Sequence, residues 1–109
     1  MNDVIKIAHL IKSKVELLER MRGEIRDRAE TKALAISEYD KALSITILKE
    51  KENGTPVSII DKVSKGKIYE KRYELELADG LYKSLISNIN SIQAELNGLQ
   101  SINRHLSEL

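Results

Sequence analysis

Cysteine, phenylalanine and tryptophan are absent from this 109-residue sequence, which contains one proline and five glycines. Without cysteine the chain can form no disulfide bond, thiolate metal site or thiol nucleophile. A core without Phe or Trp must be built largely from Ile and Leu, which suits layered helices better than a β-sandwich or a barrel. These absences favour an all-α protein.

Neither sign of charge dominates the sequence, because 18 Lys and Arg residues oppose 17 Asp and Glu residues. A general nucleic-acid coat or a membrane-surface protein usually carries a strong basic excess. No apolar run is long enough to span a membrane, and residues 4–18 are too rich in charge for a signal peptide. We therefore expect a cytoplasmic protein with no membrane association.

The few helix-breaking residues gather at one place. The turn sequence Asn53-Gly54-Thr55-Pro56 separates two long stretches of helical periodicity. We expect a single domain over residues 1–109, with a first helix over about 2–52, a tip over about 53–66 and a second long helix over about 67–107.

The tip itself carries the signals of a short helix. Thr55 suits an N-cap, Pro56 suits the first helical position, and Gly66 suits the position just past a helix end. We expect this helix either to fold across the tip or to continue into the second long helix with a kink at Gly66.

Both long stretches repeat apolar residues in alternating steps of four and three, the heptad spacing of a coiled-coil seam. The first seam comprises Val4, Ala8, Ile11, Val15, Leu18, Arg22, Ile25, Ala29, Lys32, Ile36, Tyr39, Leu43 and Thr46. The second comprises Leu75, Ala78, Tyr82, Leu85, Ile89, Ile92, Leu96, Leu99, Asn103 and Leu106. The short connection predicts an antiparallel, coiled-coil-like helical hairpin with Leu18 near Leu99 and Leu43 near Leu75.

Both helices carry more apolar residues than one seam needs. Such a widened stripe is typical of helices in a bundle, so we expect two hairpins to form a homodimeric four-helix bundle. An alternative is that the extra stripe docks another protein. The candidate self-association residues are Leu17, Met21, Leu34, Ile45, Leu81 and Ile86.

A basic segment with interleaved tyrosines follows the turn. Such a segment can follow a phosphate backbone and stack bases, so a nucleic-acid-binding accessory protein is the alternative function. The structural alternative is an ordinary solvated helix, since acidic residues at 61, 70, 74 and 76 dilute the charge. The candidate contact residues for a partner or nucleic acid are Lys62, Lys65, Lys67, Tyr69, Lys71, Arg72 and Tyr73.

No catalytic or cofactor-binding motif is present in the sequence. There is no glycine-rich phosphate loop, no nucleophile elbow and no Glu-x-x-His metal pair. His9 and His105 would meet at the open end of the hairpin, but two histidines do not make a metal site. Tyr39 and Tyr82 lie on the seams, where a structural role is expected. We predict a protein that is not an enzyme and has no cofactor.

The segment from Gly54-Thr55-Pro56-Val57-Ser58 to Lys65-Gly66, followed by Arg72 and Tyr82, resembles small helical accessory proteins encoded by phages of low-GC Gram-positive bacteria. The resemblance covers the middle third of the chain. It implies an accessory or inhibitor that acts in the host cytoplasm on a host or phage replication, recombination or defence protein. The expected function is therefore that of a non-enzymatic protein–protein interaction module.

Overall fold

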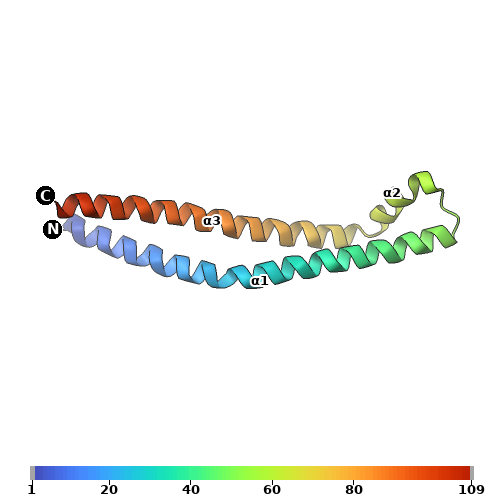
Figure 1. Ribbon diagram of the computed structural model, residues 1–109, viewed down its shortest axis with the longest axis horizontal. Helices are drawn as coiled ribbons and strands as arrows, with labels where there is room; N and C mark the ends of the chain where they lie inside the picture. Colours follow the sequence, from blue (N-terminus) through green and yellow to red (C-terminus); the bar gives the residue numbers. More distant parts are fainter. Residues whose placement is uncertain (1, 109) are drawn as a thin grey trace. The chain divides into compact units, whose positions relative to one another are not determined.

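A computed structural model describes residues 2–108 of the chain. Its three α-helices are α1 (Asn2–Glu52), α2 (Val57–Lys67) and α3 (Tyr69–Ser107), and residues 2–108 contain no strand (Figure 1). The prediction of an all-α helical hairpin with a short helix at its tip is confirmed. No helix within the described range is long and apolar enough to cross a membrane.

The helices divide into two compact units. The terminal unit contains residues 2–26 of α1 and 83–108, which include the second part of α3. The central unit is Asp27–Tyr82 and contains the rest of α1, all of α2 and the start of α3. In each unit a segment of α1 pairs with an antiparallel segment of α3.

A cluster of aliphatic side chains holds the terminal unit together. Its buried members are Leu18, Leu85, Ile89 and Leu96, and the half-buried Ile11, Met21, Ile25 and Ile92 pack against them. Every seam position predicted for α3, from Leu75 to Leu106, is buried or half-buried. The seam predicted for the second long helix is therefore confirmed.

The seam predicted for the first helix is wrong at five of its thirteen positions, which are exposed: Val4, Ala8, Val15, Arg22 and Ile36. Val15 and Arg22 are exposed, whereas the preceding residues, Lys14 and Met21, are half-buried against α3. The predicted and the observed buried stripes of α1 share Leu18, and they differ in which neighbouring side of the helix faces α3. Burial of Met21 avoids the desolvation of the Arg22 guanidinium, which favours the observed flank.

The facing residues are also displaced from the predicted pairing, by up to about two helical turns. We expected Leu18 opposite Leu99, but Leu18 lies in one cluster with Leu85, Ile89 and Leu96. The observed cross-helix pairs are Lys14 with Glu95 (2.6 Å), Arg22 with Gln93 (2.9 Å), Lys32 with Asp79 (2.9 Å) and Glu38 with Lys71 (3.5 Å). The displacement arises because α2 runs back beside α1 and not across its end (Figure 1).

The end of α1 is a Schellman turn centred on Gly54. Gly54 has a left-handed φ of 80°, its N–H donates to the carbonyl of Lys51 at 3.1 Å, and the N–H of Thr55 donates to the carbonyl of Glu50 at 3.0 Å. These two hydrogen bonds satisfy carbonyls that a helix end leaves free. Gly54 therefore supplies the backbone conformation that reverses the chain.

The boundaries of α2 differ from the expected ones. Pro56 occupies the N-cap position, and no side chain caps this end, because the Thr55 hydroxyl bonds to Glu50. Gly66 lies inside α2, and the single residue Ile68 (φ −107°, ψ 28°) separates α2 from α3. The kink into the second long helix is therefore at Ile68 and not at Gly66.

Candidate interaction surfaces

A buried carboxylate, that of Glu50, fastens α2 to the end of α1. Only 4% of Glu50 is exposed, and its carboxylate accepts hydrogen bonds from the Lys67 ammonium and the Thr55 hydroxyl. The ion pair with Lys67 lowers the pKa of Glu50, and the hydrogen bond from Thr55 lowers it further. We call this group the Glu50 latch, because its three side chains join α1, the turn and α2.

Most cations of the basic segment are bound to carboxylates of the central unit. The pairs are Lys65 with Asp61 (2.9 Å), Lys67 with Glu50, Lys71 with Glu74 (3.4 Å) and Glu38 (3.5 Å), and Arg72 with Glu76 (2.8 Å). These carboxylates raise the pKa of Lys65, Lys71 and Arg72. A phosphate backbone would have to compete with partners that these cations already have.

The two seam tyrosines have partners on the opposite helix. Tyr39 is buried, and after Glu76 its side chain is the second cause of the raised pKa of Arg72. The Lys32 ammonium lies 5.0 Å from the centre of the Tyr82 ring, within the range of a cation–π contact. Each seam tyrosine thus lies beside a cation of the opposite helix, Arg72 for Tyr39 and Lys32 for Tyr82.

Apolar side chains form an exposed row along the start of α3. Tyr69, Tyr73, Leu77 and Leu81 recur at steps of four residues, which places them on one side of a helix. The two tyrosines are 67% and 68% exposed, and the two leucines are 48% and 41% exposed. We call these four side chains the tyrosine–leucine row. Two of the expected contact residues, Tyr69 and Tyr73, therefore belong to one apolar surface.

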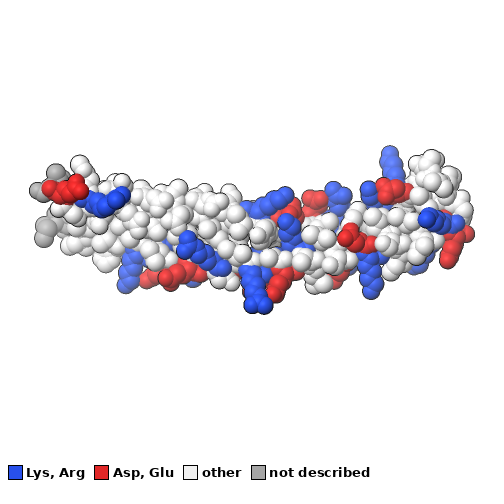
Figure 2. All heavy atoms as spheres, in the orientation of Figure 1, with Lys and Arg blue, Asp and Glu red and all other residues white. Residues whose placement is uncertain are grey.

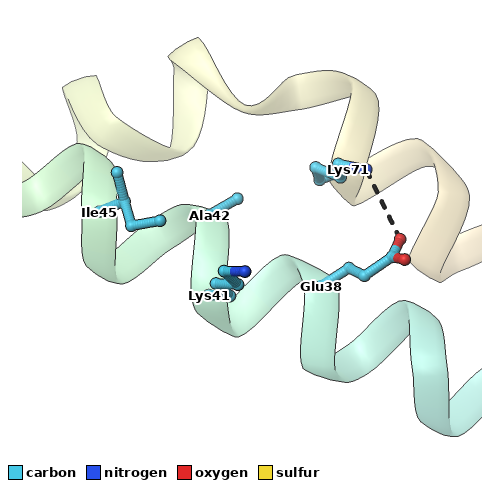
Figure 3. A pocket seen from close by; sticks show the side chains of 5 residues that line it. All are labelled: Glu38, Lys41, Ala42, Ile45 and Lys71. Carbon is cyan, nitrogen blue, oxygen red and sulfur yellow. Dashed lines mark ion pairs between the residues drawn. The ribbon is translucent and has the colours of Figure 1, made fainter.

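A shallow hollow of about 300 Å³ lies between α1 and the start of α3 in the central unit. Its lining residues are Glu38, Lys41, Ala42, Ile45 and Lys71. Figure 3 shows the side chains of Glu38 and Lys71 pointing toward one another from the two helices, where they form the 3.5 Å ion pair. The hollow is open to solvent and offers a partner a small notch beside Ile45.

The expected self-association residues are divided between the two units. Met21 packs against the aliphatic cluster of its own chain, and Leu17 and Ile86 are half-buried. Leu34, Ile45 and Leu81 are exposed and lie in the central unit. Of the expected positions, these three are the ones most accessible to a partner.

The two histidines lie in the terminal unit, and both are exposed. His105 lines a polar surface hollow with Ser101, Arg104 and Glu108. Residues 2–108 contain no group of three or more His, Cys, Asp or Glu side chains that could hold a metal ion.

No protein-family model, curated protein or solved structure matches this chain. The function must therefore be inferred from the surfaces themselves.

The sequence analysis did not predict the Glu50 latch, because Glu50 resembles any other exposed charge at the end of a helix. The available signal was its position, since it lies four residues before Gly54 and thus on the last turn of α1.

Proposed function

We propose that the protein is a non-enzymatic protein–protein interaction module that presents the tyrosine–leucine row of α3 to another protein. The observation that carries this proposal is the exposure of two tyrosines and two leucines in succession on one side of a helix. Single exposed apolar residues are common, but a contiguous exposed apolar patch marks an interaction site.

The chemistry of the row suits binding to a groove in a partner. Helices dock through anchors spaced by three, four and seven residues, and tyrosine is enriched among the residues that dominate binding energy. Charged residues such as Glu70, Glu74 and Glu76 flank the row and would form the polar rim of an interface. The row can therefore supply both the apolar centre and the soluble border of a binding surface.

The partner that we propose is a protein of a phage or host replication, recombination or defence complex, reached in the cytoplasm. This part of the proposal rests on the resemblance of the middle third of the chain to phage accessory proteins. Because the row is a docking surface and no cofactor is invoked, the protein would act by occupying a site on its target.

Nucleic-acid binding through the basic segment is the alternative function. Four cations of this segment would have to exchange a carboxylate for a phosphate, whereas Lys62 is in none of the ion pairs described above. A gel-shift titration with duplex and single-stranded DNA at low and moderate salt separates the two functions. Binding at low salt that weakens steeply with added salt would favour the alternative, because phosphate contacts release counterions.

Affinity capture from cells that encode the protein tests the proposed function. The baits are the wild type, a Tyr73→Glu and Leu77→Glu double variant, and the matched control Leu48→Glu, which also places an acid on an exposed apolar position. We expect the wild type and the control to retain the same protein and the double variant to lose it. Equal retention by all three baits would show that the row does not bind the partner.

A further inference from the structure

The last part of α1 extends beyond the start of α3 (Figure 1). The ion pair between Glu38 and Lys71 (3.5 Å) places these two residues side by side, and α3 begins only just before Lys71, at Tyr69. Because α1 and α3 are antiparallel, Tyr69 lies at about the level of residue 40 of α1. Residues 41–52 of α1 therefore lie beyond the end of α3.

This part of α1 is nevertheless covered on one side. Its buried or half-buried residues are Ala42, Leu43, Thr46, Ile47 and Glu50. The segment that lies beside it is residues 53–68, which contacts it through the Glu50 latch. The buried residues of α2, Ile60 and Ser64, mark the matching side of that helix. α2 thus covers the end of α1 that α3 does not reach.

α2 is a weak helix by itself. It has 11 residues, whereas an isolated helix shorter than roughly 12–15 residues is marginal in water. No side chain caps its N-terminus. Gly66 lies inside it, where a Cβ atom would meet nothing within 4 Å, and a glycine inside a helix favours the unfolded chain. The helical state of α2 therefore depends on its contact with α1.

The contact between α2 and α1 is small and partly polar. α2 has two buried residues, Ile60 and Ser64, and the Ser64 hydroxyl has no hydrogen-bond partner within residues 2–108. The Glu50 latch adds the bonds from Thr55 and Lys67, one at each end of α2. Segments with few buried apolar contacts open at a lower free energy than the rest of a protein. α2 is therefore the helix that should open first.

α2 can leave α1 without separating the two long helices. Residues 53–68 would then have to connect the end of α1 to Tyr69, about 18 Å away along α1. A chain of this length can extend to roughly 50 Å. Gly54 (φ 80°) and Ile68 (φ −107°, ψ 28°) interrupt the helices at the two ends of the segment. They are the positions at which the segment can swing out.

We propose that α2 is a lid on the end of α1, held closed by the Glu50 latch, and that it opens while α1 and α3 remain paired. Opening exposes Leu43 and Ile47, whereas Ile45 and Leu48 are 43% and 61% exposed already. Apolar side chains would then be distributed around this part of α1, and a helix of that kind is normally buried. The end of α1 is thus available for binding only in the open state, and α2 is its internal cover.

Thiol labelling measures the opening of the lid on the full chain. The chain has no cysteine, so Thr46→Cys introduces one thiol of similar size on the covered side of α1, and Ser44→Cys introduces one at an exposed position nearby. A thiol under a closed lid reacts only during openings, so its rate reports the open fraction. We expect a maleimide to react with the Thr46→Cys thiol about tenfold or more slowly than with the Ser44→Cys thiol.

Two lysine substitutions in α2 test the Glu50 latch. Lys67→Met removes the ammonium that pairs with Glu50 of α1. Lys65→Met removes one that pairs with Asp61 of α2 itself. Figure 2 shows Lys and Arg side chains intermixed with Asp and Glu over the central unit, so the control has to remove an equal charge. Lys67→Met should raise the labelling rate of Thr46→Cys about tenfold or more, since a hydrogen bond to a charged group contributes at least that factor, and Lys65→Met should leave it nearly unchanged.

Ala78→Cys distinguishes opening of the lid from opening of the whole central unit. Ala78 is 7% exposed in α3, next to the Asp79 that pairs with α1, and its thiol should stay protected with or without Lys67→Met. The proposal is overturned if the Thr46→Cys thiol reacts as fast as the Ser44→Cys thiol, or if Lys67→Met accelerates it no more than Lys65→Met does. Equal acceleration of the Ala78→Cys thiol by Lys67→Met would overturn it as well. None of these results affects the capture experiment on the tyrosine–leucine row, which tests the proposed function separately.

Discussion

The helices within the terminal unit and the helices within the central unit are held together by different kinds of buried side chain. The buried side chains of the terminal unit are four aliphatic residues in one cluster. Those of the central unit are Tyr39, Ile60, Ala78, Glu50 and Ser64, and ion pairs such as Lys32 with Asp79 join its helices. Apolar burial is non-directional and insensitive to charge, whereas ion pairs depend on geometry, pH and salt.

This difference assigns separate tasks to the two units. The aliphatic cluster fixes two helix segments side by side in the terminal unit. In the central unit the turn at Gly54 reverses the chain, and the Glu50 latch holds α2 through polar contacts that specify one geometry. If this difference is correct, substitutions in the two units should differ in how much they change the free energy of unfolding and in how that change depends on pH.

The largest effect is expected in the aliphatic cluster. Leu18 is 2% exposed, and truncation to alanine should cost about 3 kcal/mol in the free energy of unfolding, through lost burial and the cavity that remains. The control is Val15→Ala, three residues away on α1 at an exposed position. Urea denaturation followed by circular dichroism measures both variants.

The same pair of variants tests which flank of α1 faces α3. If Val15→Ala were as costly as Leu18→Ala, the seam would run through Val15 and Arg22 as the heptad pattern predicts, and the observed flank would be incorrect. A loss below about 1 kcal/mol at Val15 supports the observed flank, since surface truncations have small effects.

The second effect is an acid sensitivity of the Glu50 latch in the central unit. Because the folded state lowers the pKa of Glu50, the Glu50 latch stabilises the unit fully above the ordinary value of 4.5 and loses this contribution as the pH falls through the lowered value. We expect the NMR signals of α2 amides to lose their helical shifts in acid before those around Leu85 and Ile89 do.

Glu50→Gln should bring this loss of α2 structure to neutral pH, because the uncharged amide cannot pair with the Lys67 ammonium. Glu52→Gln is the control, an exposed residue at the end of the same helix. Parallel loss of both units in acid, in the wild type and in Glu50→Gln alike, would show that the latch does not set the pH response. In alkali the ion pairs of Lys65 and Lys71 weaken instead. Because the folded state raises the pKa of both lysines, their stabilisation is fully present below the ordinary value of 10.5 and is lost as the pH rises through the raised values.

The contrast between the units also explains which features could be predicted from the sequence. The seam of α3 could be predicted because its apolar residues recur without interruption from Leu75 to Leu99, so one face is unambiguous. On α1, apolar residues occur on both flanks of Leu18, and spacing alone does not decide between them. Which residues of α1 and α3 face each other depends on whether α2 lies across the end of α1 or beside it. The Glu50 latch holds α2 beside α1 through polar contacts, and these have no periodicity that the sequence could reveal.

The smallest effect should be a gain of stability at Ser64. This residue is 0% exposed in α2, and its hydroxyl has no hydrogen-bond partner within the described chain. A buried hydroxyl without a partner costs free energy, and alanine is the better helix former, so Ser64→Ala should stabilise the central unit by about 1 kcal/mol.

Ser58→Ala, an exposed serine in the same helix, measures the part due to helix propensity alone. If Ser64→Ala gains more than Ser58→Ala in urea denaturation, the surplus is the cost of the buried hydroxyl. If it destabilises the protein, the hydroxyl has a partner in solution, and the central unit depends on yet another polar contact. A small side chain would still be required at position 64, because α2 packs there with no surface left exposed. Ser64→Val, which adds volume and no polar group, should therefore lose stability whatever the result for Ser64→Ala.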